Sequence, residues 1–222
     1  MNKHERLRRL AQLDSNTVSD ALDFLALPGA TNGLMPLWNC VKVVGLASTV
    51  QLGPKVGDAP TSHLISPVID RVDDEDHILV IAGGVNGISS WGDILANAAK
   101  HKGIRATIID GFSRDIRGSA SIGYPVYGRG VTMISARNRL VQLNSGNTVT
   151  VAGVPVSEDD YVIADECGTV FVGKNRIDEV LDLAERITAR QNRMVEAVRA
   201  GQPVEQVMHD RQFDAIQKEY QA

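Results

Sequence analysis

Short apolar runs and one amphipathic segment alternate in the middle of the chain. Residues 77–82 form an apolar run that stops at a Gly-Gly pair, which predicts a strand followed by a turn. Residues 94–100 are Ala-rich, and Asp93 ahead of them is a preferred helix N-cap. Residues 104–109 form a second apolar run, rich in β-branched side chains and ended by Asp-Gly. The order strand, helix, strand predicts a βαβ unit with parallel strands.

Polar residues follow both strands of this unit. In a βαβ unit the two loops leave from the same edge of the sheet, where α/β proteins bind ligands. Asp93 lies in or just after the first loop, and Arg114 and Asp115 lie in the second. We therefore expect these three side chains, which are far apart in sequence, to meet in space.

Each residue type at this edge suits one part of an anion and metal site. Asp115 is a hard oxygen ligand for magnesium or manganese, and Asp93 suits a metal-bound water. Arg114 offers a planar fork of donors for a carboxylate or keto oxygen. Gly92 lets backbone come close, and the first amides of a helix bind anions. On spacing alone, a simple N-cap at Asp93 and a solvated turn at residues 114–115 are equally good interpretations.

Hydrophobic periodicity predicts elements on both sides of this unit. Helical spacing predicts helices over residues 3–13, 18–27 and 176–200, and one within 61–72 that starts near Ser66 with Pro67 in its first turn. Apolar, β-branched runs predict one or two strands over 41–52 and short strands over 123–127, 130–134, 148–156, 161–164 and 169–172. The acidic run 73–76 is typical of a solvated turn. Many short strands favour a layered α/β sandwich over a doubly wound sheet.

Composition limits the partners and the compartment. The chain has 222 residues, of which 43% are hydrophobic and 23% charged, which is ordinary for a soluble domain. A net charge of -4 gives no reason to expect nucleic acid as a partner. Cys40 and Cys167 form no framework and fit a reducing compartment. The first residues lack the apolar core of a signal peptide, and no run reaches membrane-spanning length. We expect a cytoplasmic protein without a membrane partner.

Several common catalytic motifs are missing from the sequence. The Gly-rich stretch 83–87 lacks the Lys-Ser or Lys-Thr of a phosphate-binding loop, and no G-x-G-x-x-G opens a helix. The five histidines make no H-E-x-x-H, and no serine stands in a G-x-S-x-G setting. These absences leave the Asp and Arg residues of the central unit as the candidate chemistry.

The central motifs resemble one known family. Gly92-Asp93-Ile94-Leu95, followed by Asp110-Gly111 and Arg114-Asp115, resemble the family of 4-hydroxy-4-methyl-2-oxoglutarate aldolases and regulators of ribonuclease E activity A, the RraA-like proteins. Residues 45–50 and 161–168 are similar to strands of that family. The resemblance, which covers residues 19–201, implies an αββα sandwich of the swivelling β/β/α type. It also implies homotrimers or hexamers with sites between subunits. We expect residues 1–222 to form one RraA-like domain, in which 175–222 are a C-terminal helix and arm.

The resemblance also implies a reaction. Its aldolases use Mg²⁺ or Mn²⁺ to cleave 4-hydroxy-2-oxo acids to pyruvate by retro-aldol chemistry, and they often decarboxylate oxaloacetate. Carried over by position, Asp115 binds the metal, Asp93 holds metal-bound water, and Arg114 binds the substrate oxygens. The backbone of Gly92, Asp93, Ile94 and Leu95 binds the pyruvate carboxylate.

The C-terminal helix departs from the family pattern. Aldolases of this family carry a Glu about ten residues before a Gly in this helix, where the present chain has Gln191 or Asn192. Both are neutral amides and do not replace a carboxylate, although Glu185 and Glu196 lie nearby. Two alternatives to the aldolase therefore remain. One is a non-catalytic regulator that binds a ribonuclease or helicase. The other is a metal-dependent lyase or hydrolase acting on another small acid.

Overall fold

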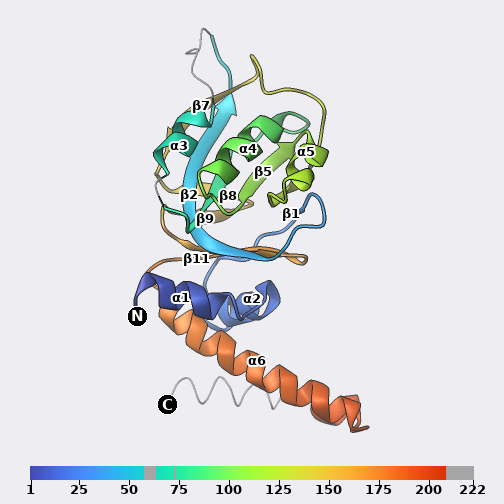
Figure 1. Ribbon diagram of the computed structural model, residues 1–222. Coiled ribbons are helices and arrows are strands. Elements are labelled where there is room, and N and C mark those ends of the chain that lie inside the picture. Colours follow the sequence, from blue (N-terminus) through green and yellow to red (C-terminus); the bar gives the residue numbers. More distant parts are fainter. Residues whose placement is uncertain (58–63, 73, 209–222) are drawn as a thin grey trace.

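A mixed sheet of nine strands organises the protein in the computed structural model, which describes residues 1–57, 64–72 and 74–208. The order along the sheet is β1-β6-β5-β3-β2-β10-β11, with β4 beside β5 and β7 beside β2, whereas β8 and β9 form a separate hairpin (Figure 1). The strands are β1 (Met35–Pro36), β2 (Val43–Pro54), β3 (His77–Ala82), β4 (Ser89–Trp91), β5 (Thr107–Ser113), β6 (Val126–Val131), β7 (Leu140–Ser145), β8 (Val149–Val151), β9 (Val154–Val156), β10 (Tyr161–Asp165) and β11 (Gly168–Val172).

Helices pack on the outside of this sheet in two groups. They are α1 (Lys3–Leu10), α2 (Ser15–Phe24), α3 (Ser66–Arg71), α4 (Asp93–His101), α5 (Ile116–Ser121), α6 (Ile177–Arg199) and α7 (Val204–Val207). In Figure 1, α1, α2 and α6 lie below the sheet, and α3, α4 and α5 lie at its other side. Among the helices of the described residues, none has the length and hydrophobicity that crossing a membrane requires.

Three apolar cores correspond to these layers. The first joins α1, α2 and α6 to β10 and β11, and includes Leu10, Leu22 and Ile187. The second lies under α3 and α4, around Ile69 and Trp91. The third lies inside the curved sheet, where the β8–β9 hairpin packs against β2 and β3. The predicted layered α/β sandwich of swivelling β/β/α type is therefore confirmed.

The two ends of the sheet almost meet. The Thr31 amide donates to the Thr169 carbonyl (3.2 Å), and the Thr169 hydroxyl donates to the Leu34 carbonyl (3.4 Å). These bonds connect the segment beside β1 to β11, the strand at the opposite end of the order. Because the two ends of the sheet nearly meet, backbone N–H and C=O groups find partners that they would lack at an open sheet edge.

The predicted βαβ unit is confirmed. β3 and β5 are adjacent and parallel, with α4 between them in sequence. The predicted strand boundary at residue 109 was too early, because β5 continues to Ser113. A short strand, β4, was not predicted, and it pairs in parallel with the last part of β5. The pairing of β4 with β5 matters for the site, because the two polar loops start directly after these paired strands.

Capping residues explain where several helices begin. Asp14 caps α2 by accepting the Thr17 amide (2.7 Å), so this helix starts at Ser15 and not at the predicted Val18. Helix α3 starts at Ser66 with Pro67 in its first turn, as predicted. Residues 61–63 of the predicted helix range lie outside the described residues, as do residues 209–222 of the predicted C-terminal arm.

Other boundaries were predicted incorrectly. The two short strands expected over 123–127 and 130–134 are one strand, β6, which continues through Gly128 and Gly130. Strand β7 and helix α5 were not predicted at all. Both elements are short and partly polar, so their sequences carry little periodic signal.

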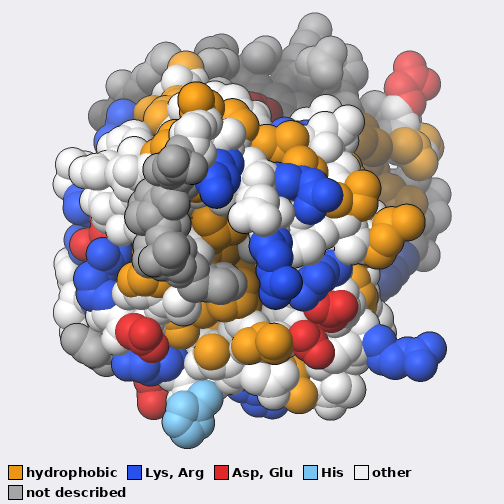
Figure 2. All heavy atoms as spheres, turned by 90° about the horizontal axis from the view of Figure 1, so that it is seen from above, with side chains coloured by type: hydrophobic (Ala, Val, Ile, Leu, Met, Phe, Trp, Pro, Cys, Tyr) orange, Lys and Arg blue, Asp and Glu red, His pale blue; other side chains and the backbone are white. Residues whose placement is uncertain are grey.

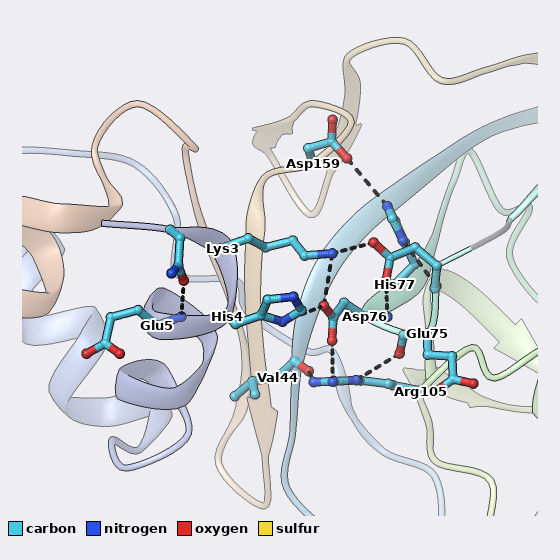
Figure 3. A network of polar contacts seen from close by, with 11 residues as sticks. Lys3, His4, Glu5, Val44, Glu75, Asp76, His77, Arg105 and Asp159 are labelled. Carbon is cyan, nitrogen blue, oxygen red and sulfur yellow. Dashed lines mark hydrogen bonds and ion pairs between the residues drawn. The ribbon is translucent and has the colours of Figure 1, made fainter.

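The acidic run was also misinterpreted, because Asp76 is buried. Its carboxylate forms ion pairs with Lys3 (3.0 Å) and with Arg105 (Figure 3). The His4 Nδ1 atom lies 3.6 Å from the same carboxylate. Arg105 also donates to the carbonyls of Val44 (2.8 Å) and Glu75 (3.0 Å). The carboxylate therefore joins α1 to the loop that leads into β5. The predicted solvated turn is wrong here, and Asp73 lies outside the described residues.

We predict that Asp76→Ala lowers the free energy of unfolding by about 2–4 kcal/mol, because Lys3 and Arg105 lose the counter-charge of a buried carboxylate. Urea denaturation measures this change. Asp178→Ala is the matched control, since the Arg6–Asp178 pair (2.7 Å) also anchors α1 but its carboxylate is exposed. We expect the control to cost about 1 kcal/mol or less. Equal losses in the two variants would contradict the role given to burial.

Candidate functional site

The loops after β4 and β5 lie against each other at one edge of the sheet. The Arg114 amide donates to the Trp91 carbonyl (2.9 Å), which holds the start of the second loop against the end of β4. The Ser89 hydroxyl donates to the same carbonyl (2.6 Å). Gly92 then occupies the N-cap position of α4, and Asp115 occupies the N-cap position of α5. Two helix N-termini therefore start side by side.

Glycines permit this close approach. A Cβ atom on Gly92 would lie 2.9 Å from Asp115 Oδ2 and 3.4 Å from Arg114 Nε. A Cβ atom on Gly118 of α5 would lie 2.5 Å from the Asp93 Cβ, which is closer than real side chains approach. The backbone of Gly92 is extended, with φ -159°, so space and not conformation requires glycine there. The motif glycine thus brings the two loops into contact.

Asp93 was predicted to be the N-cap of α4, and this is wrong. Gly92 occupies the cap position, and Asp93 is the first helical residue. No side chain caps the start of α4, so the amides of its first turn, including those of Ile94 and Leu95, are available to a ligand. The Asp93 carboxylate is then free for a role other than capping.

Asp115 adopts an uncommon backbone conformation. Its φ is +54°, in the left-handed region that Asp and Asn tolerate better than other non-glycine residues. It occupies the N-cap position of α5, but its side chain makes no capping bond. The carboxylate instead pairs with Arg114 Nε (3.1 Å). Both side chains of the pair are about half exposed, at 41% and 40%, so a ligand reaches them.

A cavity of about 660 Å³ opens over these loops. The α4 and α5 side of its lining is formed by Ser89, Ser90, Trp91, Gly92, Asp93, Ile94, Leu95, Arg114 and Asp115. Its other side is formed by Lys55, Leu64, Ser135, Ala136, Arg137, Asn138, Leu140, Val141 and Gln142. Figure 2 views the end of the molecule where β2 terminates and shows Lys and Arg side chains gathered beside hydrophobic ones.

The floor of the cavity is rigid. Trp91 is 2% exposed and stacks on Tyr124, with ring centroids 6.2 Å apart. Burial raises the pKa of Tyr124, which hydrogen-bonds to Thr107 (2.9 Å). Among the described residues, the buried Ser90 hydroxyl and Trp91 Nε1 have no hydrogen-bond partner. Such a floor holds the loops in place and leaves polar atoms beside the cavity.

Two carboxylates could hold a divalent cation here. Asp93 and Asp115 line the same cavity, and no third His, Cys, Asp or Glu joins them as a metal-binding cluster within the described chain. Magnesium commonly binds through one or two carboxylates together with water and substrate oxygens. The donor set therefore fits Mg²⁺ or Mn²⁺ and does not resemble the closed, four-ligand site of structural zinc.

The C-terminal helix contributes none of the described lining residues of this cavity. Its Gln191 accepts from the Thr17 hydroxyl (3.5 Å) and donates to Asp20 (3.2 Å), and thereby ties α6 to α2. Partial burial raises the pKa of the Asp20 carboxyl, and the neighbouring Asp23 adds to the effect. Glu185 is engaged with Arg9 (2.7 Å). Within one chain, α6 is a packing element.

The structure brings together all six residues that the sequence singled out, because Gly92, Asp93, Ile94, Leu95, Arg114 and Asp115 line one cavity. Their individual roles stay predictions. Sequence reasoning missed the opposite wall, especially Lys55 and Arg137. The signal was weak: two arginines lie close together after β6, and a lysine follows the Gly-Pro pair that ends β2.

Comparisons with known proteins agree on one family. The model of the RraA-like family (Aldolase/RraA) matches residues 15–171. Protein DlpA of Legionella pneumophila is 29% identical over 92% of this chain, but the chain spans only 33% of DlpA. A protein of Halalkalibacterium halodurans named "Putative 4-hydroxy-4-methyl-2-oxoglutarate aldolase" is 29% identical over 78% of this chain and 79% of its own length.

Two solved structures share the fold over nearly their whole length. An uncharacterized protein of Pseudomonas syringae pv. tomato has a TM-score of 0.81 at 30% identity, covering 92% of this chain and 96% of that one. RraAS2 of Streptomyces coelicolor, described as an unusual member of the RNase ES inhibitor RraA family, has a TM-score of 0.77 at 26% identity, covering 86% and 96%.

We predict that Gly92→Ala shifts the Asp115 carboxylate and the Arg114 side chain while the fold persists. The added methyl group meets only side-chain atoms of those two residues, and an extended backbone accepts alanine. A crystal structure of the variant measures the shift. Gly173→Ala is the control, because a Cβ there meets nothing within 4 Å. An unmoved Asp115 carboxylate in Gly92→Ala would contradict the crowding described above.

Proposed function

The chain belongs to the RraA-like family, and from this premise we propose that it is a divalent-metal-dependent lyase that cleaves a 4-hydroxy-2-oxo acid to pyruvate. One observation carries the proposal. An arginine, two carboxylates and an uncapped helix N-terminus line a single cavity. This combination binds the two adjacent oxygen groups of a 2-oxo acid and supports charge that develops on the keto oxygen.

The chain's own residues account for substrate binding. The amides of Ile94 and Leu95 point out of the first turn of α4 toward the position of a carboxylate. The Arg114 guanidinium binds the keto oxygen and a carboxylate oxygen through its fork of donors. The Arg114 backbone amide is fixed to the Trp91 carbonyl and its Nε pairs with Asp115 (3.1 Å), so the side chain is oriented before the substrate arrives.

The reaction itself is a retro-aldol cleavage. The bond between C3 and C4 breaks, the 4-hydroxyl loses its proton, and the electron pair moves to the C2 oxygen as the pyruvate enolate. Arg114 stabilises the negative charge on that oxygen. We assign Asp93 to hold the water through which the hydroxyl proton leaves, so that the Asp93 carboxylate takes up this proton. Protonation of C3 then gives pyruvate, and oxaloacetate decarboxylation passes through the same enolate.

A bound Mg²⁺ or Mn²⁺, held by Asp115 with help from Asp93, would supply Lewis-acid stabilisation of the same developing charge. Such stabilisation removes the need for a Schiff base. Lys100 and Lys102 lie at the far end of α4, but Lys55 lines the cavity and offers an amine. The two mechanisms are distinguishable, because only a Schiff base is trapped by borohydride.

A second candidate function is a regulator whose cavity is not catalytic. The observation that favours it is Gln191, a neutral amide that is already bonded to Thr17 and Asp20 within the chain. A solved relative belongs to a family of RNase ES inhibitors, which makes a ribonuclease the partner to test. Inhibition of a purified ribonuclease E by equimolar protein, without any pyruvate release from oxo acids, would establish this function in place of the lyase.

The first test of the lyase is metal removal. We expect pyruvate release from 4-hydroxy-4-methyl-2-oxoglutarate or oxaloacetate to disappear with chelator and to return with Mg²⁺ or Mn²⁺. A coupled lactate dehydrogenase assay measures it. Borohydride together with substrate should leave the activity intact. Chelator-resistant turnover that borohydride abolishes would replace the metal mechanism with one through Lys55.

Substitutions then test the roles of single residues. We expect Arg114→Ala to lower kcat by about 10²–10³-fold, because the enolate loses its main donor. We expect Asp115→Asn to abolish Mn²⁺ binding in calorimetry together with turnover, since asparagine tolerates the left-handed backbone but lacks the charge.

Arg117→Ala is the matched control, because Arg117 is exposed on α5 close to Arg114 and does not line the cavity. It should retain normal turnover. Each variant should unfold with the same denaturation curve as the wild-type protein, so that a loss of activity is not a loss of folding. Full activity in Arg114→Ala would refute the role assigned to that side chain.

A further inference from the structure

The register between β4 and β5 shifts directly ahead of the site. Ser89 lies opposite Phe112 in this parallel pair, and Trp91 lies opposite Ser113. Strand β4 therefore advances by two residues where β5 advances by one, and Ser90 is the additional residue, as in a β-bulge. Such an irregularity bends a strand and redirects the groups that follow it, and it is common beside functional sites. Here it acts on the peptide group that follows Trp91.

Two short hydrogen bonds fix this peptide group. The Ser89 hydroxyl (2.6 Å) and the Arg114 amide (2.9 Å) both donate to the Trp91 carbonyl. The Ser113 hydroxyl approaches the same oxygen (3.4 Å). Ser89 is 3% exposed and Ser113 is fully buried, so water hardly competes for the carbonyl.

A fixed carbonyl also orients an amide. The peptide bond between Trp91 and Gly92 is planar and trans, since the described chain contains no cis peptide bond. Its N–H therefore points opposite to its C=O, away from the Ser89 hydroxyl and the Arg114 amide. Within residues 1–57, 64–72 and 74–208 the Gly92 amide has no hydrogen-bond acceptor, and Gly92 lines the cavity.

Three further amides continue from this one. Asp93, Ile94 and Leu95 form the first turn of α4, and no side chain caps the helix. First-turn amides have no partner within their own helix, so they are available to an anion together with the Gly92 amide. Their value to a ligand depends on a fixed direction, which the bonds at the Trp91 carbonyl supply.

Resting on the proposed lyase function, we propose that Ser89 is a positioning residue, whose hydroxyl holds the Trp91–Gly92 peptide so that the Gly92 amide donates to the carboxylate of the bound 2-oxo acid. Ser89 acts through the peptide, because its hydroxyl is engaged with the Trp91 carbonyl. The carboxylates of Asp93 and Asp115 are assigned to the cation and its water, which leaves the amides to the anionic end of the substrate. A donor fixed before the ligand arrives loses less freedom on binding.

Amide resonances of the wild-type protein test the donor. Pyruvate, which is not cleaved further, is titrated in the presence of Mg²⁺ while NMR follows the backbone amides. We expect the Gly92 amide resonance to shift and to saturate with the dissociation constant that calorimetry gives. The Gly173 amide, which lies outside the cavity lining, should not shift. An unmoved Gly92 resonance at saturating pyruvate, or no binding of pyruvate, would overturn the proposal.

Substitution of Ser89 tests the positioning. We expect Ser89→Ala to weaken pyruvate binding about fivefold and to speed hydrogen exchange of the Arg114 amide by a similar factor, because one hydrogen bond at the Trp91 carbonyl is lost. Ser89→Thr keeps the hydroxyl and should restore both values to within about twofold of the wild type. Mn²⁺ affinity should be unchanged in both variants, whereas a general disturbance of the two loops would lower it.

Ser119→Ala is the matched control. The Ser119 hydroxyl is also fully buried but has no hydrogen-bond partner among the described residues, and Ser119 lies on α5 outside the cavity lining. Pyruvate affinity and Arg114 exchange should not change in this variant. If Ser89→Ala does not fold, Ser89→Cys replaces it with the same expectations, because a thiol is a weak donor. Unchanged pyruvate affinity in the folded Ser89 variant, or an equal loss in Ser119→Ala, would overturn the proposal.

Turnover distinguishes this inference from the proposed function. If pyruvate affinity depends on the Ser89 hydroxyl but no 4-hydroxy-2-oxo acid is cleaved, the lyase proposal fails and the positioning role remains. If 4-hydroxy-4-methyl-2-oxoglutarate is cleaved, Ser89→Ala should lower kcat/KM about fivefold and Ser89→Thr should not. A wild-type kcat/KM in Ser89→Ala would refute the role of Ser89 and leave the lyase in place.

Discussion

The close contact between the loops after β4 and β5 is the constraint on which the candidate site depends. The Arg114 amide bonds to the Trp91 carbonyl, and the absence of a side chain on Gly92 allows Asp115 to lie against it. Parallel pairing of β4 with β5 brings the two loops to the same edge. A methyl group at position 92 would crowd the Asp115 carboxylate and the Arg114 side chain, which the glycine leaves in place.

The starts of α4 and α5 at this contact have no side-chain capping bond. Polar groups left without such a partner are more typical of functional sites than of stable cores. Asp115 has a left-handed backbone and gives up the capping bond that its position offers. Helix α4 begins on a glycine, so its first amides are also uncapped. A side-chain N-cap typically contributes about 1 kcal/mol to stability. Both helices lack this bond at the place where a ligand could bind their first amides.

Ion pairs and hydrogen bonds outside the site hold the N-terminal and C-terminal helices in place. Asp76 joins α1 to the start of β5, and the Arg9–Glu185 pair and the Gln191 bonds hold α6 against α1 and α2. In Figure 1 these helices lie on the side of the sheet away from α4 and α5. The neutral Gln191, in a position where the resemblance implies Glu, thus serves packing within the chain. The cavity relies instead on the carboxylates of its own two loops.

The sequence by itself determined the elements whose signals are local. Pro67 marked the start of α3, and two apolar runs around an Ala-rich segment predicted the βαβ unit that unites Asp93, Arg114 and Asp115. Only the tertiary structure decided what depends on distant partners. Burial of Asp76 requires Lys3 and Arg105, and the wall carrying Arg137 exists because β7 pairs with β2. Such long-range pairing leaves no periodic pattern in the chain, so neither could be predicted from it.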